Sequence, residues 1–192
     1  YHIAYVSTPD MFGSPESMAI WDSFYGHLIN NYHLSPRVAL EAVSRGGLYA
    51  HTWAKRNPTK VSCIYAEVPV CDFTTWPKQI SEKDWMMLKE SYRFSDEKEA
   101  LSYDDMPIHQ LGGLASLKVP VLHSICNIDK VVPPASNSLV FGMNYIKAGG
   151  PYGAIPMDKV FNVENMKGHH FHLEHVDKIV SFLSLIHISE PT

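Results

Sequence analysis

The chain has 192 residues, which is enough for one domain with a sizeable core and too few for two. A hydrophobic content of 45% and a charged content of 19% are typical of a folded globular protein, so the composition excludes a disordered chain. The net charge of −4 and the scattered lysines and arginines argue against a nucleic-acid surface, and the apolar runs are too short to span a bilayer, so we expect neither nucleic acid nor a membrane as a partner.

The cysteines and the chain ends say little about the cell compartment. The three cysteines are odd in number and lack the spacing of a metal site. The sequence starts at Tyr1 without an initiator methionine or a signal peptide, so we expect a natural N-terminus upstream, and a secreted or periplasmic location stays open. Residues 184–192 read like a translated sequencing adapter, and we expect a non-native tail outside the fold.

The start of the chain predicts a strand, a helix and a second strand. Residues 2–7 form a short apolar segment that ends in a proline-containing loop signal. Apolar residues recur at helical spacing after Pro15, which suits a first helical position, and the pattern ends near Tyr32. A turn with a proline then leads into an apolar, β-branched strand over residues 38–43.

Ser44 lies at the joint between this strand and a helix that is predicted to run to Arg56. A serine on a sharp strand-to-helix turn is typical of a nucleophile elbow, which projects the hydroxyl above the sheet. Ala42 and Gly46 are small, as we expect where the strand and helix backbones pass close together. The pattern reads AxSxG instead of the usual GxSxG, and an ordinary loop between a strand and a helix remains an alternative.

The rest of the chain predicts strands alternating with helices, which indicates an α/β fold with a mostly parallel sheet flanked by helices. Residues 72–118 interrupt this pattern, and we expect a lid-like insertion there. The predicted strands are 61–68, 119–126 and 159–163, and the predicted helices are 82–92, 96–103, 135–147 and 175–182.

Polar residues follow two of these strands. Asp129 comes just after the strand that ends at Cys126, and His169 and His170 follow the last predicted strand. Ligands bind outside the carboxyl ends of parallel strands, so we expect Ser44, Asp129 and a histidine at a common edge of the sheet. Their order along the chain is that of the catalytic triads of α/β-hydrolases.

Three motifs carry a resemblance to this family. They are Ser44-Arg45-Gly46-Gly47, Asp129-Lys130-Val131-Val132-Pro133 and Gly168-His169-His170. They resemble the SRGG elbow, the DxxVP acid loop and the GHH histidine loop of bacterial esterase-like and prolyl-oligopeptidase-like members, and the resemblance covers nearly all of residues 1–183. It implies a partial α/β-hydrolase domain that is truncated at its N-terminal strands.

Carried over to this chain, the resemblance implies Ser44 as the nucleophile, His169 as the general base and Asp129 as the residue that orients the histidine. A serine hydroxyl is a weak nucleophile until an imidazole takes its proton, and a buried carboxylate fixes the imidazole tautomer. The backbone N–H of Arg45 would be one oxyanion donor, and its guanidinium would pair with a carboxylate or the substrate. The implied reaction is hydrolysis of a small-molecule ester, with a carbohydrate-linked ester as one option, through an acyl-enzyme and without a cofactor or metal.

Other interpretations of single residues stay open. His170 is a rival for the base, and Asp72 is a rival for the acid, although a loop-capping carboxylate is its simpler role. Asp129 itself would also suit a turn cap. The histidines at 169, 170, 172 and 175 are a residue type that often binds metals, but adjacent histidines rarely point the same way and no zinc motif accompanies them.

Alternatives also remain for the insertion and for the whole protein. The aromatic residues Phe73, Trp76, Trp85 and Tyr92 suit the core of a lid, although a sugar-bearing ester would allow some of them to stack on it. A serine peptidase of the prolyl-oligopeptidase type would use the same triad on an amide. A catalytically dead α/β-hydrolase would serve as a binding module.

The resemblance also predicts what the sequence lacks. In the family, the second oxyanion donor comes from a loop next to a strand between the 2–7 segment and the strand of Ser44, and neither is found in this sequence. Removing one such donor costs about 2.7–4 kcal/mol in the transition state, and a missing central strand leaves backbone groups unpaired. We therefore expect an active parent hydrolase and a 192-residue chain that is neither stable nor active alone.

Overall fold

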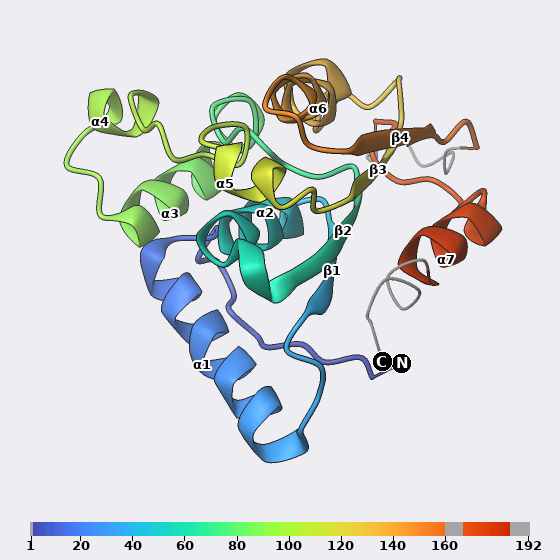
Figure 1. Ribbon diagram of the computed structural model, residues 1–192. Helices are drawn as coiled ribbons and strands as arrows, with labels where there is room; N and C mark the ends of the chain where they lie inside the picture. Colours follow the sequence, from blue (N-terminus) through green and yellow to red (C-terminus); the bar gives the residue numbers. More distant parts are fainter. Residues whose placement is uncertain (1, 160–166, 185–192) are drawn as a thin grey trace.

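In the part of the chain that the structure describes, four parallel strands form one sheet. The structure is a computed structural model, and it describes residues 2–159 and 167–184 (Figure 1). The strands are β1 (Val38–Val43), β2 (Val61–Glu67), β3 (Val121–Ile125) and β4 (Tyr152–Pro156), in that spatial order, and each neighbouring pair is parallel. The predicted α/β fold with a parallel sheet is therefore confirmed.

The position of each strand explains its burial. β2 and β3 lie inside the sheet and are buried at nearly every residue, as expected for parallel strands that are covered on both faces. β1 alternates instead, with Leu40 and Ala42 buried and Glu41 and Val43 exposed. This strand, which leads to Ser44, lies at an edge of the sheet and has one covered face.

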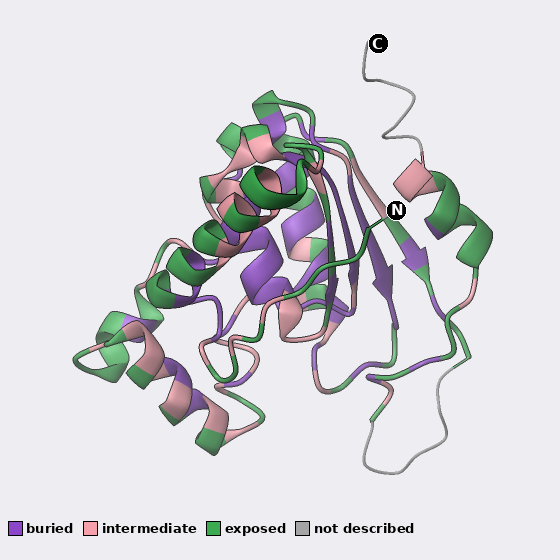
Figure 2. Cartoon of the chain, turned by 90° about the horizontal axis from the view of Figure 1, so that it is seen from below, coloured by how far each residue is buried: buried purple, intermediate pink, exposed green. Residues whose placement is uncertain are grey.

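Helices cover the two faces of the sheet unequally, as Figures 1 and 2 show. On the first face, one hydrophobic core contains Leu40, Ile64 and Val121 of the sheet. It also contains residues of α1 (Pro15–Tyr32), α2 (Gly46–Arg56), α5 (Gly112–Ser116) and α6 (Ser138–Lys147), and of the two helices that follow β2 in the sequence. On the second face, Ile179 of α7 (Val176–Ser184) packs in a smaller core with Tyr65.

Between β2 and β3 the chain leaves the sheet and forms helices and loops. This excursion contains α3 (Glu82–Tyr92) and α4 (Glu97–Leu101), and its centre is a cluster of aromatic rings around Phe73. Phe73 and Trp85 are buried in the cluster, so they serve as core and are not available to stack on a ligand. That residues 72–118 act as a lid stays a prediction.

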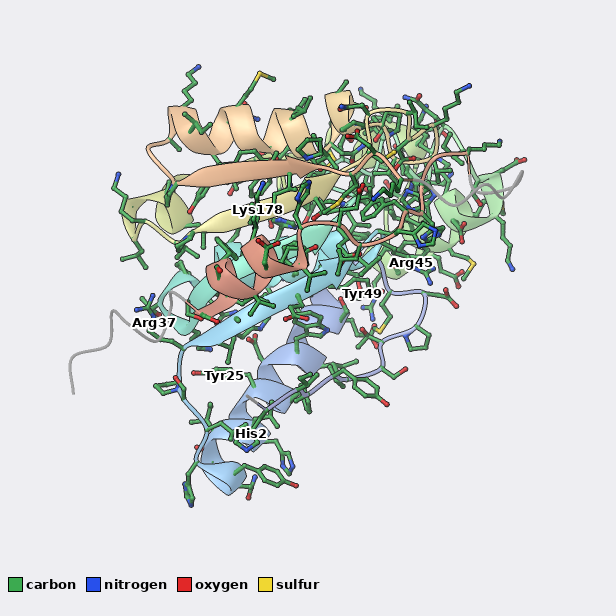
Figure 3. The ribbon with its side chains drawn as sticks, turned by 90° about the vertical axis from the view of Figure 1, so that its right-hand side faces the viewer. His2, Tyr25, Arg37, Arg45, Tyr49 and Lys178 are labelled. Carbon is green, nitrogen blue, oxygen red and sulfur yellow. The ribbon has the colours of Figure 1, made fainter. Side chains whose placement is uncertain are left out.

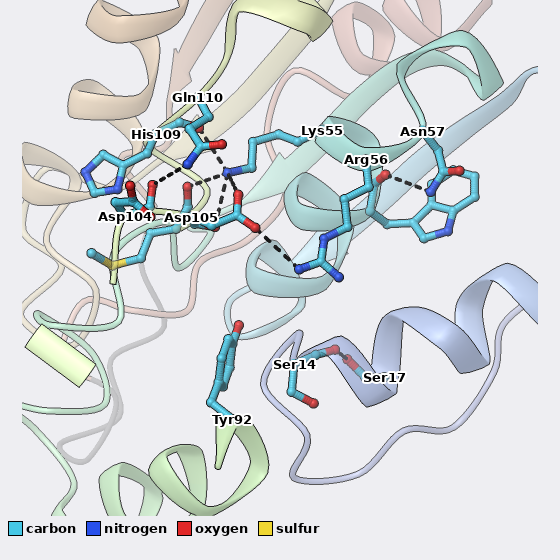
Figure 4. A network of polar contacts seen from close by, with 12 residues as sticks. Ser14, Ser17, Lys55, Arg56, Asn57, Tyr92, Asp104, Asp105, His109 and Gln110 are labelled. Atoms are coloured by element: carbon cyan, nitrogen blue, oxygen red, sulfur yellow. Dashed lines mark hydrogen bonds and ion pairs between the residues drawn. The ribbon is translucent and has the colours of Figure 1, made fainter. Parts of the chain in front are cut away.

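A buried lysine fixes the end of this insertion to α2 (Figure 4). Lys55 Nζ forms an ion pair with Asp105 at 2.9 Å and donates to the carbonyl oxygens of Asp105, Met106 and His109 at 3.1, 2.7 and 3.0 Å. Burial lowers the pKa of Lys55, and the bond with Asp105 counteracts this effect. The insertion is thereby held against the helix that follows Ser44.

One predicted strand is wrong. Residues 2–7 pair with no strand among the described residues, and Ile3 and Tyr5 are 93% and 87% exposed, because an apolar segment needs a neighbour for its backbone groups before it becomes a strand. β4 at Tyr152–Pro156 was not predicted, and residues 160–163 of the predicted strand 159–163 lie outside the described part. The sequence did not indicate this strand because glycine and proline, here Gly153 and Pro156, are unfavourable inside most strands. A strand at the edge of the sheet tolerates them.

The short helix α5 was not predicted, and the other helices and strands agree with their predictions to within a few residues. α3 has the predicted bounds, whereas α4 is shorter than the predicted 96–103. Prolines shorten two further elements: β3 begins after Pro120, and the 3-10 turn η2 (Pro134–Ser136) precedes α6. A second 3-10 turn, η1 (Pro58–Lys60), joins α2 to β2.

Candidate active site

Ser44 occupies a tight turn between β1 and α2. Its φ of 51° lies in the left-handed region, which a residue with a side chain rarely adopts and which costs about 1–3 kcal/mol. Backbone hydrogen bonds hold it there: its N–H donates to Glu67 at 2.8 Å, and its carbonyl oxygen accepts from Gly47 and Val70 at 2.9 Å each. The elbow conformation is therefore imposed by β2 and by the segment that follows it.

At this turn, atoms of neighbouring residues come closer to Gly47 than to Gly46. A Cβ atom at Gly47 would lie 2.6 Å from Pro69 Cβ and 2.7 Å from the carbonyl oxygen of Val70, distances that real Cβ atoms do not show. At Gly46 it would meet the Cβ of Ala42 at 3.5 Å, which is ordinary contact. A small residue is thus required at Gly47, which was not identified from the sequence, and much less at Gly46.

His169 reaches the serine from the other end of the chain. Its Nε2 lies 2.7 Å from Ser44 Oγ, and the residue is 5% exposed. Gly168, with φ +81°, precedes it, and a Cβ there would lie 2.6 Å from the carbonyl oxygen of Ile128. The histidine loop can therefore approach the loop of Asp129 only because this residue is glycine.

Asp129 completes a line of three side chains. Its Oδ2 lies 2.7 Å from His169 Nδ1, and its Oδ1 accepts from the N–H groups of Val131 and Val132 at 2.8 and 2.9 Å. The residue is 4% exposed. Because a carboxylate only accepts hydrogen bonds, Nδ1 carries the imidazole proton and Nε2 is left to accept one from Ser44.

Arg45, which is labelled in Figure 3, follows Ser44 and directly precedes the first residue of α2. Its guanidinium bonds with Asp10 at 3.2 Å and lies 5.5 Å from the centre of the Phe12 ring, so the predicted pairing with a carboxylate is present. Its backbone N–H lies beside Ser44, at the end of a helix where N–H groups favour negative charge.

Sequence reasoning missed Tyr49, which builds the loop beside the serine. The Tyr49 hydroxyl accepts from the N–H groups of Met11 and Phe12 at 3.1 and 2.7 Å and donates to the carbonyl oxygen of Thr8 at 2.9 Å. Burial raises the pKa of this hydroxyl, so it keeps the proton that it donates. The loop holds Asp10 near Arg45, and the only signal in the sequence was the place of Tyr49 in the helix after Ser44.

The rival acid and base lie elsewhere. The His170 ring stands 4.9 Å from that of His169 at 63°, and the residue is exposed, whereas His169 is the histidine that contacts Ser44. Asp72 Oδ1 accepts from the N–H and the hydroxyl of Thr74 at 2.8 and 2.6 Å, which is the loop-capping role.

Among residues 2–159 and 167–184, no group of three or more His, Cys, Asp or Glu side chains is arranged to hold a metal ion. No helix within these ranges is both long and apolar enough to cross a bilayer.

Solved structures share the shape of this chain at low sequence identity. A puromycin-hydrolysing peptidase of Mycobacterium tuberculosis matches with a TM-score of 0.63 and 16% identity, over 91% of this chain and 24% of that chain. A sugar hydrolase from Lactococcus lactis matches with a TM-score of 0.61 and 18% identity, over 95% and 71%. A thermostable esterase matches with a TM-score of 0.56 and 14% identity, over 88% and 36%. No protein-family model and no curated protein matches the sequence.

These similarities establish the fold. The three proteins described above are hydrolases, and the chain has the α/β-hydrolase fold that its motifs predicted. The chain spans about a quarter of the length of the peptidase, so the activity of the whole protein does not follow from the match.

Proposed function

We propose that this chain carries the catalytic centre of a serine hydrolase that cleaves a carboxylic ester. The observation that supports this most is the unbroken line from Ser44 Oγ through His169 to Asp129, with 2.7 Å at both links. Serine, imidazole and buried carboxylate in this order are what acyl transfer requires.

Each group has a role in the proposed reaction. His169 takes the proton of Ser44 as the serine oxygen attacks the ester carbonyl, and Asp129 stabilises the imidazolium that forms. The N–H of Arg45 donates to the oxyanion. The protonated His169 then gives its proton to the leaving alcohol, and it later activates the water that hydrolyses the acyl-enzyme.

Because the same triad cleaves esters and amides, an experiment has to distinguish between these two substrate classes. The similar structures include esterases and peptidases, which supports the two options equally. A small-molecule ester is our first choice, with a carbohydrate-linked ester as a variant of it. The alternative is a binding module without catalytic activity, and we favour it less. Binding alone does not require a serine within hydrogen-bonding distance of a histidine that is itself bonded to a carboxylate.

A fluorophosphonate probe tests the proposal directly. We expect the complete gene product to be labelled at Ser44, and Ser44→Ala to lose labelling and p-nitrophenyl ester turnover. Ser23→Ala is the matched control, since Ser23 is an exposed serine on α1 whose hydroxyl donates to Ala19 at 3.0 Å. Absence of labelling in the complete gene product would contradict the proposal.

Two additions to the assay settle the finer points. An aminoacyl p-nitroanilide replaces the ester, and faster turnover of the anilide would favour the peptidase. The 192-residue chain is assayed alone, and we expect little turnover, because the strand of Ser44 is at the edge of the described sheet and Arg45 is the single oxyanion donor that we assign.

A further inference from the structure

A buried amide lies between the loop of Asp129 and the start of the insertion. Asn137 is fully buried, and its Oδ1 accepts from the N–H groups of Cys71 and Asp72 at 2.9 and 3.0 Å. Its Nδ2 donates to Thr75 Oγ1 at 3.0 Å and to the carbonyl oxygen of Pro133 at 3.1 Å. An asparagine amide has two donors and two acceptor positions, so every one is used.

These four bonds join a loop of the candidate site to the base of the insertion. Pro133 is the last residue of the DxxVP loop, and it directly follows Val132, whose N–H binds Asp129 Oδ1 at 2.9 Å. Cys71 to Thr75 is the base of the insertion, where the chain leaves β2. A shift of Pro133 would therefore move an N–H group that holds the carboxylate.

Asn137 does not perform the usual task of its position. It precedes α6, and asparagine in this place normally accepts a hydrogen bond from the first turn of the helix. The Asn137 side chain makes no such bond, and its amide is turned to the two loops instead. A buried amide in the interior is costly unless its bonds are all made, so its geometry is tightly specified.

We propose that Asn137 is a positioning residue that holds the DxxVP loop where Asp129 reaches His169 and ties this loop to the base of the insertion. The role rests on the proposed hydrolase function. It acts on the placement of Asp129 and not on the substrate, so its loss lowers kcat and leaves KM nearly unchanged.

The test compares two asparagines of the same region in the complete gene product. We expect Asn137→Ala to lower kcat about 10- to 100-fold, because misplacement of a catalytic group by about 1 Å costs up to 10²-fold. KM stays within about threefold, as only the positioning is changed. Asn144→Ala is the control: Asn144 lies on α6 and its Nδ2 donates to Ile108 at 2.9 Å, away from the DxxVP loop, and both constants should stay within about twofold.

A second variant covers the case in which Asn137→Ala does not fold. Thr75→Val keeps the shape of the side chain and removes both the acceptor of Asn137 Nδ2 and the donor to the carbonyl oxygen of Asp72 at 2.8 Å. We expect a fall in kcat of about 3- to 10-fold, less than in Asn137→Ala, because Asn137 loses one of its four bonds. Unchanged kcat in Thr75→Val, or in a folded Asn137→Ala, would overturn the proposal.

A spectroscopic signal separates this inference from the proposed function. The proton shared by His169 Nδ1 and Asp129 Oδ2 at 2.7 Å gives a downfield NMR resonance that is read without turnover. We expect Asn137→Ala to weaken or shift it and Asn144→Ala to leave it unchanged. If the wild-type protein lacks probe labelling but shows this difference, the hydrolase proposal fails and the positioning role stands. An unchanged resonance in Asn137→Ala overturns the role.

Discussion

At the scale of single residues, the candidate site depends on how a buried carboxylate is held. Asp129 is 4% exposed and receives bonds from two backbone N–H groups and from His169. A buried carboxylate without such partners would be costly. The loop that follows β3 therefore supplies both the buried carboxylate and two of the groups that stabilise it.

Replacing Asp129 by asparagine should inactivate the protein without unfolding it. The amide can donate to His169 Nδ1, which moves the imidazole proton to Nε2, where it blocks proton transfer from Ser44. We expect kcat to fall by about 10⁴-fold, the effect known for the corresponding change in serine proteases, with little change in the thermal melting curve.

Asp72→Asn is the control for this change, because Asp72 is the rival acid and already bonds with Thr74. We expect less than about a tenfold change in its kcat, as for a residue outside the line of three. An equal loss of activity in the two variants would mean that Asp129 has been given the wrong role.

At the scale of elements, the turn between β1 and α2 places the serine. The sequence indicated this turn through the change from β-branched to helical spacing and through the small residues around Ser44. It did not show that Pro69 and Val70, after the neighbouring strand, press on Gly47. The different surroundings of Gly46 and Gly47 arise only when the strands and the helix pack together.

Adding a methyl group to each glycine should give changes of opposite sign. Gly47→Ala places a Cβ at 2.6 Å from Pro69, so the backbone must move, and we expect a loss of about 1–3 kcal/mol in the free energy of unfolding. Gly46→Ala finds ordinary contact at 3.5 Å, and alanine in a helix is favoured by about 0.5–1 kcal/mol over glycine. Urea unfolding of both variants is the measurement, and a more stable Gly47→Ala would refute the packing argument.

At the scale of the whole molecule, a pair of buried histidines connects a helix to the sheet inside the core. His51 Nδ1 donates to the carbonyl oxygen of Gly47 at 2.8 Å, and its Nε2 lies 3.0 Å from His123 Nε2, which joins α2 to β3. Both residues are fully buried. Burial lowers the pKa of His51 to about 4 and that of His123 well below its usual value.

This pair should make the fold sensitive to acid. Below pH 6.5 the unfolded chain binds protons that the folded protein does not accept until about pH 4 at His51, so stability is complete above pH 6.5 and falls as the pH is lowered. Between pH 6.5 and 5 we expect a loss of about 1.5 kcal/mol from His51 and a further loss from His123, measured by urea unfolding.

The double variant His51→Leu, His123→Leu is the matched comparison, since the Tyr152 hydroxyl near His123 keeps its bond to Ser138 at 2.8 Å. Its stability should depend less on pH over this range. An equal dependence in wild type and variant would assign the acid sensitivity to other groups.

Much of the fold and of the candidate site was predictable because it depends on neighbours in the sequence. Apolar runs placed the two inner strands, helical spacing placed α1 and α3, and the turn signals after the strands pointed to Ser44, Asp129 and the histidine pair at 169 and 170. These patterns are local, and folding preserves them.

The remaining features were decided by contacts between distant segments. His169 and not His170 meets Ser44 across 125 positions of sequence, and residues 2–7 stay outside the sheet although their composition suits a strand. The roles of Tyr49 and Asn137 likewise arise from loops that the chain brings together only on folding. The sequence by itself therefore determined which elements form and which side chains follow the strands, whereas the tertiary structure alone decided which of those side chains touch, since hydrogen bonds act over about 3 Å and not along the chain.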